Sequence, residues 1–213
     1  MNLSNKRVLI TAGPTWVPID NVRVISNIAT GETGILLAEE AHRQGAKVTL
    51  LLGPISDCCL DNSINIIRFK FFDELHKVVK KELKNKKYDI VIHSAAVSDY
   101  KPEICYRQKI KSGIKKWRLN LIPTSKIIDL IKKIDPALFL VGFKFEPQAG
   151  KELLVKKTRG LINRAKLDLA VANSIEKNKY SAYIINRKQI CGPITSRANL
   201  AKELISFMQK INY

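Results

Sequence analysis

Residues 7–14 (RVLITAGP) and 89–100 (DIVIHSAAVSDY) decide the fold of this 213-residue chain. Each is a short apolar run that ends in small residues, which is typical of a buried strand entering a turn. Other apolar runs of strand length follow along the chain and alternate with amphipathic stretches of helix length. This alternation predicts βαβ units and a parallel sheet.

The elements outside these two stretches complete the expected architecture. We expect strands at 7–11, 47–52, 64–69, 89–94, 138–143 and 168–172, a final hairpin at 182–191, and helices opening at 31–34, at 73–86, from about 124, at 150–165 and after 195. Residues 109–122 (KIKSGIKKWRLNLI) alternate around a Ser-Gly turn, which predicts a β-hairpin. The fold class is therefore α/β, one doubly wound, Rossmann-like, mostly parallel sheet over residues 1–213, with a projecting β-hairpin flap at about 107–122.

The charge of the chain is strongly positive and concentrated. The net charge is +18, and residues 101–166 hold 17 lysines and arginines against 5 acidic residues. Such a zone suits a nucleoside triphosphate and a phosphorylated substrate as well as it suits nucleic acid. Aromatic residues are sparse in it, which argues against stacking on single strands. A lysine-rich solvated surface with no ligand remains the alternative.

Cysteine usage and hydropathy indicate where the protein works. The four cysteines show no CxxC spacing, and the adjacent pair Cys58 and Cys59 has too few histidines around it for a zinc site, so we expect no metal ligands. Spare thiols favour a reducing cytoplasm. No stretch resembles a signal peptide or a membrane span, so we expect a cytoplasmic protein without a membrane partner.

The loop after the first strand is unusually long. A dinucleotide-binding turn packs its glycines into six residues. Here the next glycine after Gly13 is Gly31, 18 residues further along the chain, and Gly34 follows it. The helix that begins there still offers free N–H groups to a phosphate. Within the insertion, Arg23 can contact a carboxylate or phosphate and Asn27 can donate to an oxyanion. Glycines also begin helices, and charged or amide side chains also hold loops in place. A ligand-binding role and a purely structural role for these residues therefore both stay open.

A second group of candidates follows residues 89–94. Ala95 and Ala96 are small enough to let a ligand approach the backbone, and Asp99 is placed to accept from ribose hydroxyls or to hold a cation. Lys109 and Lys111 would share one face if their segment is a strand. Two neighbouring ammonium groups are most easily explained by a shared anion.

Six ordered motifs resemble those of phosphopantothenate–cysteine ligases. They are ITAGPT, the D-x-V-R-x-I-S-N loop leading to T-G-x-x-G, AAVSDY, KIK, VGFK-x-E and LDLAVAN, and they cover about residues 6–205. The resemblance implies an enzyme of coenzyme A biosynthesis. Such enzymes join 4′-phosphopantothenate to L-cysteine through an acyl-nucleotide intermediate, an acyl-cytidylate when CTP is the nucleotide, and release pyrophosphate.

The resemblance also implies roles for individual residues. Asn27 resembles the asparagine that holds the acyl-nucleotide intermediate, Arg23 the arginine of the same loop, and Lys109 the flap lysine at the nucleotide phosphates. We therefore expect Asn27, Lys109 and Arg23 to be catalytic. The expected nucleotide-binding residues are Gly13, Gly31, Gly34, Ala95, Ala96, Asp99, Lys109, Ser125, Phe143, Lys157 and Asn173.

The resemblance further implies cofactors and partners. Mg²⁺ is expected because a triphosphate that loses pyrophosphate needs its charge neutralised. CTP is expected as the co-substrate, with ATP as the alternative, because the motifs look bacterial or archaeal. Ser125 replaces a proline of the archaeal-type pattern and Ala29 a frequent serine, and these departures bear on the choice of base more than on the reaction. A homodimer is expected, with no nucleic-acid partner. Many members are fused to a decarboxylase, so this chain is expected to be a stand-alone ligase or one half of such an enzyme, with phosphopantothenoylcysteine decarboxylase as a separate partner.

Two other functions fit parts of the pattern. An NAD(P)-binding oxidoreductase would need compact glycines and an acidic residue ending the second strand, where this chain has Leu52 and Gly53. A basic nucleic-acid-binding module would bind with a steep salt dependence and without competition from CTP. A screen of cofactor and nucleic-acid binding separates both from a ligase.

Overall fold

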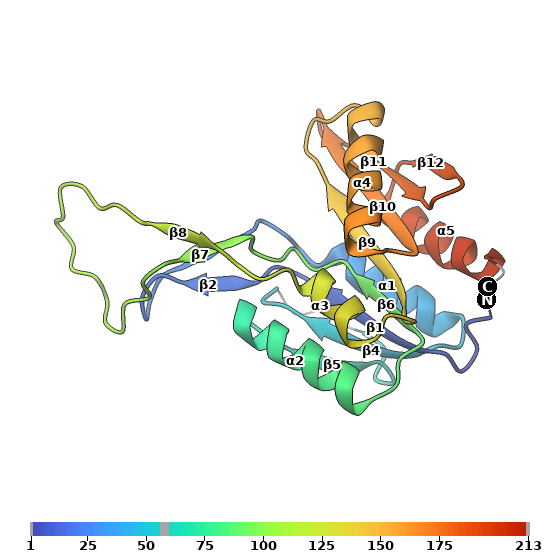
Figure 1. Cartoon of the computed structure of the whole chain (residues 1–213), viewed down its shortest axis with the longest axis horizontal. Coiled ribbons are helices and arrows are strands. Elements are labelled where there is room, and N and C mark those ends of the chain that lie inside the picture. The colour runs from blue at the N-terminus through green and yellow to red at the C-terminus, as the bar shows by residue number, and fades with distance from the viewer. Residues whose placement is uncertain (1, 56–59, 212–213) are drawn as a thin grey trace.

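The structure of the chain, a computed structural model, describes residues 2–55 and 60–211. An eight-stranded sheet has the order β12-β11-β10-β9-β6-β1-β4-β5 (Figure 1). Its strands are β1 (Arg7–Ala12), β4 (Lys47–Leu52), β5 (Asn65–Arg68), β6 (Ile90–His93), β9 (Phe139–Phe145), β10 (Leu169–Glu176), β11 (Lys179–Ile185) and β12 (Ile190–Ile194). The first six of these are parallel and follow the order 3-2-1-4-5-6 of dinucleotide-binding folds.

Helices cover both faces of the sheet. Alternate residues of each strand point to opposite faces, so Val8 and Ile10 lie in one apolar core and Leu9 in the other. One core lies under α1 (Glu32–Arg43) and α5 (Arg197–Lys210), and the other under α2 (Phe72–Asn85), α3 (Ile127–Ile134) and α4 (Lys151–Ala165). The doubly wound α/β prediction is confirmed.

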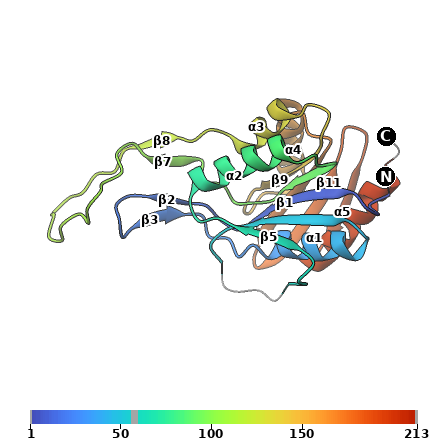
Figure 2. The ribbon, with the colours of Figure 1, turned by 90° about the horizontal axis from the view of Figure 1, so that it is seen from below.

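Two antiparallel ribbons project from the carboxyl edge of the sheet (Figures 1 and 2). One pairs β2 (Trp16–Pro18) with β3 (Val24–Ser26), and the other pairs β7 (Tyr100–Pro102) with β8 (Leu121–Pro123). We call residues 16–26 and 100–123 together the projecting arm. The arm extends away from the end of the molecule where the two chain termini lie together (Figure 1).

The predicted hairpin at 109–122 is corrected by the structure. The flap does project, but residues 103–120 form a loop without strands, closed at its base by β7 and β8. Six lysines and arginines stand in this loop against one acidic residue, and their mutual repulsion opposes close strand pairing. Lys109 and Lys111 therefore do not share the face of a strand.

Several other boundaries differ from the predictions. The long loop after β1 contains the β2–β3 ribbon, and β10 continues to Glu176 and forms a hairpin with β11. The helix expected from about 124 begins at Ile127. Cys58 and Cys59 lie outside the described residues. Among the residues that the structure does describe, no helix is long and apolar enough to cross a membrane.

Candidate functional site

The loops that follow β1 and β6 are joined by backbone hydrogen bonds. The Ala96 amide donates to the Gly13 carbonyl at 2.9 Å, and the Thr15 amide donates to the Ala96 carbonyl at 3.3 Å. β1 lies between β4 and β6, so the winding of the chain reverses between these strands. Ligands of open α/β sheets bind at such a reversal, at the carboxyl ends of the strands. The candidate site therefore lies here, at the root of the projecting arm.

Three glycines let helix α1 approach this edge. Gly13 and Gly31 have φ angles of +81° and +75°, which residues with a Cβ rarely adopt. A Cβ on Gly34 would lie 2.3 Å from the Ala12 Cβ and 2.8 Å from the Ser94 hydroxyl. The glycines therefore have a packing role, and their close packing brings the N-terminus of α1 beside β1, where the Glu32 amide donates to the Thr30 hydroxyl at 3.4 Å. That terminus is a favourable place for a phosphate.

Asn27 reaches the same edge from the end of the β2–β3 ribbon. Its side-chain Nδ2 donates to the carbonyls of Ala96 and Val97 at 3.1 and 3.2 Å. Both N–H groups of the amide are thereby used within the protein, while the residue is exposed to solvent. In this arrangement the side chain offers a ligand its Oδ1 acceptor, and the expected donation to an oxyanion requires Nδ2 to leave one of the two carbonyls. The structure thus brings together Asn27, Ala95 and Ala96, three of the residues singled out from the sequence.

Asp20, the aspartate of the D-x-V-R-x-I-S-N motif, organises the arm, as the purely structural interpretation of this loop expects. The carboxylate is 3% exposed and accepts from the backbone amides of Val22 and Arg23 at 2.9 and 2.8 Å. It also accepts from the Arg23 guanidinium at 2.9 Å and from the backbone amide of Ile110 at 3.1 Å. An aspartate two residues before a turn is a detectable local signal, but Ile110 lies 90 residues away in the sequence.

The Arg23 side chain continues this connection into the 103–120 loop. It donates to the carbonyl of Ile110 at 3.3 Å, and its guanidinium lies 5.6 Å from the centre of the Trp117 ring. Burial raises the pKa of the Asp20 carboxyl, but hydrogen bonds from Ile110, Val22 and Arg23 together with the Arg23 charge outweigh burial and lower that pKa overall. Arg23 therefore joins the two halves of the arm.

The remaining candidates from the flap side stand at the surface. The Asp99 carboxylate is 65% exposed and forms an ion pair with Lys126 at 2.6 Å. Ser125 and Lys109 are exposed, the latter in the 103–120 loop. Asp99 therefore follows β6 as expected, with Lys126 as a cationic neighbour that the sequence analysis did not single out.

A second group of candidates lies further along the carboxyl edge. Phe143 on β9 is partly buried against the core under α1 and α5, and the β9–β10 register places Asn173 on the same face. The Oδ1 atom of Asn173 is buried and has no hydrogen-bond partner among the residues that the structure describes. Lys157 on α4 forms an ion pair with Glu146 at 2.6 Å. These residues lie on strands and a helix beyond β6, so they would form the other side of a site that extends along this edge.

A buried histidine at the end of β6 is linked to the loop that follows this strand through the Thr11 hydroxyl. The His93 Nδ1 lies 2.9 Å from the Thr11 hydroxyl, and that hydroxyl accepts from the backbone amide of Ala95 at 3.2 Å. Burial lowers the pKa of His93 to about 4, so the ring is neutral at pH 7. The Thr11 hydroxyl therefore connects a neutral imidazole to the backbone of the site.

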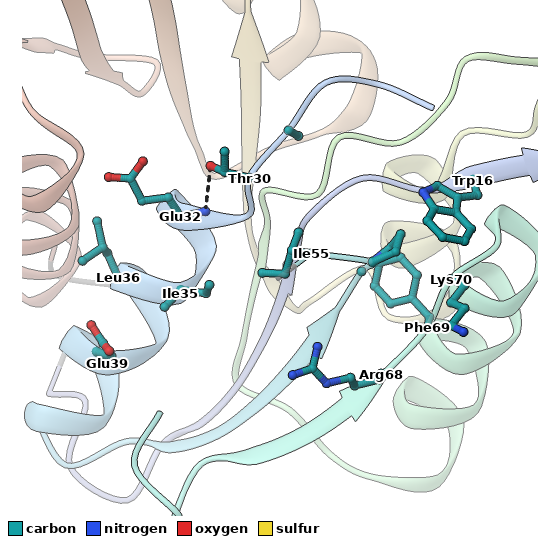
Figure 3. A pocket seen from close by; sticks show the side chains of 13 residues that line it. Trp16, Thr30, Glu32, Ile35, Leu36, Glu39, Ile55, Arg68, Phe69 and Lys70 are labelled. Carbon is teal, nitrogen blue, oxygen red and sulfur yellow. Dashed lines mark hydrogen bonds between the residues drawn. The ribbon is translucent and has the colours of Figure 1, made fainter. Parts of the chain in front are cut away.

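A cavity of about 910 Å³ opens on the β4–β5 side of α1 (Figure 3). It is lined by side chains of α1, by the loop after β4 and by the end of β5, with Trp16 and Phe69 at one side. Figure 3 shows Arg68, Lys70, Glu32 and Glu39 around apolar residues. The residues predicted as catalytic do not line this cavity, but Ala29 and Thr30 of the loop that carries Asn27 do, so the cavity borders that loop.

Comparisons with known proteins identify relatives of this chain. The chain is 43% identical to the coenzyme A biosynthesis bifunctional protein CoaBC of Thermococcus kodakarensis over 82% of its length, and 32% identical to the CoaBC of Borreliella burgdorferi over 97%. It spans about half the length of these relatives, 43% and 53%. A solved Cab2 mutant in complex with phosphopantothenate-cysteine shares the fold, with a TM-score of 0.77, 19% identity and coverage of 97% of this chain and 87% of that one.

A family model decides the assignment, because it matches almost the whole chain. The model describes the C-terminal domain of DNA/pantothenate metabolism flavoproteins and matches residues 3–211. That range includes both sides of the candidate site and the entire projecting arm. The chain therefore belongs to the family of the DNA/pantothenate metabolism flavoprotein C-terminal domain.

Proposed function

We propose that this chain is a single phosphopantothenate–cysteine ligase domain of coenzyme A biosynthesis. The carboxylate of 4′-phosphopantothenate attacks the α-phosphorus of a nucleoside triphosphate, and the bond to the β-phosphate breaks, which releases pyrophosphate. The amine of L-cysteine then attacks the acyl carbon of the acyl-nucleotide, the nucleoside monophosphate leaves, and the amine loses a proton. The product is 4′-phosphopantothenoylcysteine.

The observation that carries this proposal is the position of Asn27. Its amide lies on the Ala96 and Val97 carbonyls, at the winding reversal of the sheet. A phosphate at the α1 N-terminus and an acyl group at the Asn27 amide would lie along the same edge, as an acyl-nucleotide requires. The family membership, the names of the CoaBC relatives and the phosphopantothenate-cysteine bound by Cab2 support the same reaction.

The roles of the individual residues follow from their places around this edge. Asn27 holds the acyl-nucleotide, with Arg23 fixing the loop that presents it. Lys109 supplies positive charge from the arm to the leaving pyrophosphate. The expected base and phosphate contacts at Asp99, Ser125, Phe143, Lys157 and Asn173 complete the site from the strands and helices beyond β6.

Mg²⁺ is proposed as the metal of the reaction, because a triphosphate that loses pyrophosphate needs charge neutralisation. Among the described residues no group of three or more histidine, cysteine, aspartate or glutamate side chains converges. Asp99, an exposed carboxylate, fits as one protein ligand for an ion carried mainly by the phosphates. In excess EDTA, pyrophosphate release should stop.

CTP is the proposed nucleotide, in line with the bacterial and archaeal relatives. Its kcat/KM should exceed that of ATP by at least an order of magnitude, and equal values for the two nucleotides would overturn this choice.

The cysteine spacing of the sequence favours the cytoplasm as the place where the protein works. The relatives are named as bifunctional, and a decarboxylase is the proposed consumer of the product.

A homodimer is proposed from the apolar surface of the projecting arm. In the arm, Val22 and Ile114 are 64% and 51% exposed, and Trp117 and Leu121 are 40% and 45% exposed. An arm that carries so much apolar surface is typical of a contact with a second chain. Sedimentation at micromolar concentration should give twice the chain mass, and an active monomer would contradict the proposal.

Pyrophosphate release tests the whole function. The assay contains the nucleotide, 4′-phosphopantothenate, cysteine and Mg²⁺, and each component is omitted in turn. We expect amide formation only in the complete mixture. Release independent of phosphopantothenate, or binding of NAD(P) or nucleic acid without competition from CTP, would refute the ligase and favour the corresponding alternative.

A further inference from the structure

Two lysines share one carboxylate at the end of β9. Glu146 forms ion pairs with Lys144 at 2.8 Å through Oε1 and with Lys157 at 2.6 Å through Oε2. Lys144 belongs to β9, whereas Lys157 comes from α4. The two ammonium groups lower the pKa of the Glu146 carboxyl, which keeps it ionised. The cluster therefore holds two positive charges and one negative charge in a fixed arrangement.

The cluster stands at the ligand edge of the sheet. The backbone amide of Glu146 donates to the carbonyl of Asn173 at 3.0 Å, so the carboxylate follows directly on the strand pair that carries Phe143 and Asn173. The side chains of Lys144 and Lys157 are 36% and 43% exposed, against 19% for Glu146. The ammonium groups are thus accessible to a ligand, and the carboxylate lies beneath them.

Such an arrangement suits a polyphosphate. Each ammonium group has three N–H donors, and the bond to Glu146 uses one of them. A free lysine loses rotamer entropy when it binds a phosphate, and a carboxylate that already orders two lysines reduces this cost. Lysines held side by side can contact neighbouring phosphate groups of one chain at the same time.

We propose that Lys144 and Lys157 form a paired contact for the β- and γ-phosphates of the nucleotide, and that Glu146 is the residue that positions them. This inference rests on the proposed nucleotide-dependent function and adds Lys144 and Glu146 to the site. Lys144 is a binding residue, and Glu146 acts only through the two lysines. The remaining positive charge of the cluster balances part of the charge of the leaving pyrophosphate.

Direct binding tests the lysines without catalysis. The Kd values of CTP, CMP and inorganic pyrophosphate are measured by calorimetry for the wild-type chain and for Lys144→Ala, Lys157→Ala and Lys156→Ala. We expect each of the first two substitutions to weaken CTP and pyrophosphate by about tenfold and CMP by less than about twofold, because the contact is to the outer phosphates. Lys156 is exposed on the same helix, so Lys156→Ala is the matched control for charge.

Glu146→Gln tests positioning by the sign of its effect. The substitution makes the cluster more positive, so charge alone predicts tighter CTP binding. Positioning predicts weaker binding, with Kd raised about threefold or more and with KM for CTP raised more than kcat is lowered. Glu146→Asp should recover part of the affinity, and all variants should keep the wild-type melting temperature. Tighter CTP binding by Glu146→Gln would overturn the role of Glu146.

The inference and the proposed function can fail separately. If CTP binds and Lys144→Ala weakens it, but no amide forms with phosphopantothenate and cysteine, the paired contact stands and the ligase assignment fails. If the ligase reaction proceeds and Lys144→Ala binds CTP as Lys156→Ala does, the ligase stands and the paired contact is wrong. Equal losses for CTP and CMP would also refute a contact to the outer phosphates.

Discussion

Replacing Asn27 by aspartate removes both hydrogen bonds that fix this side chain. In the structure Nδ2 donates to the Ala96 and Val97 carbonyls at 3.1 and 3.2 Å. An aspartate of the same size would direct a carboxylate oxygen at these two carbonyl oxygens. It would also place a negative charge beside the α-phosphate and the developing oxyanion. Both effects oppose the arrangement that the proposed reaction needs.

The size of the effect follows from the two bonds. At about 1 kcal/mol for each hydrogen bond, their loss alone weakens the docking of the residue by about 2 kcal/mol, which corresponds to about a 30-fold loss of rate if the docked loop is required. Repulsion of the phosphate adds to this loss. Asn27 is exposed and outside both cores, so the free energy of global unfolding should change by less than about 1 kcal/mol.

The assay follows amide formation at saturating substrates, and rapid-quench experiments with labelled CTP separate formation of the acyl-nucleotide from its reaction with cysteine. Asn21→Asp is the matched control, because Asn21 is exposed in the same arm. We expect kcat to fall at least about 30-fold for Asn27→Asp, and Asn21→Asp to retain wild-type activity. Retention of more than about a tenth of the wild-type kcat by Asn27→Asp, a loss below ~1.4 kcal/mol, would refute the role given to Asn27.

Three further substitutions test the arm and the support of the site. Lys109→Ala should slow the activation step by ~10²-fold while Lys116→Ala, in the same loop, costs much less, and equal losses would mean that only the general positive field acts. Asp20→Asn should leave the melting temperature almost unchanged but make the loop around Ile110 more sensitive to limited proteolysis, because the carboxylate accepts from both halves of the arm; an unchanged cleavage rate would contradict this. The pKa of His93 is lowered to about 4 from 6.5, so the contribution of this residue to stability is fully present above pH 6.5 and is lost as the pH falls toward 4. Urea unfolding should therefore show about 2 kcal/mol less stability at pH 5 than at pH 7. The substitution His93→Gln should remove most of that difference. An identical pH dependence in both proteins would refute the buried neutral imidazole.

The sheet could be predicted from the sequence because its strands are buried on both faces. Apolar runs such as Arg7–Ala12 and Ile90–His93 are set by local composition, and their glycine and alanine endings identify the ligand edge. The loops after these strands singled out Asn27 and Asp99, the resemblance to a ligase family then implied their roles, and the structure places them after β3 and β6 at that edge.

The arm could not be predicted in the same way. The strands of the β2–β3 ribbon have three residues each, too few for a periodic signal. The hairpin predicted from the alternation of residues 109–122 was wrong, because the prediction did not take account of the positive charge of the loop. The roles of Asp20 and Glu146 depend on partners such as Ile110 and Lys157, which folding brings near and sequence spacing does not reveal.

The projecting arm is held by hydrogen bonds at two places along its length. Asn27 fastens its root to the loop after β6, and Asp20 fastens the 103–120 loop to the β2–β3 ribbon further out. A load applied to the tip therefore reaches the Ala96 backbone through these hydrogen bonds and through side chains packed at the root, such as Val17. The 103–120 loop has no strands, so it should bend more easily than the root, to which it passes on small displacements. A partner that binds the tip would therefore tilt the Asn27 amide relative to the sheet by small angles. This tilt would change the geometry of the reacting groups.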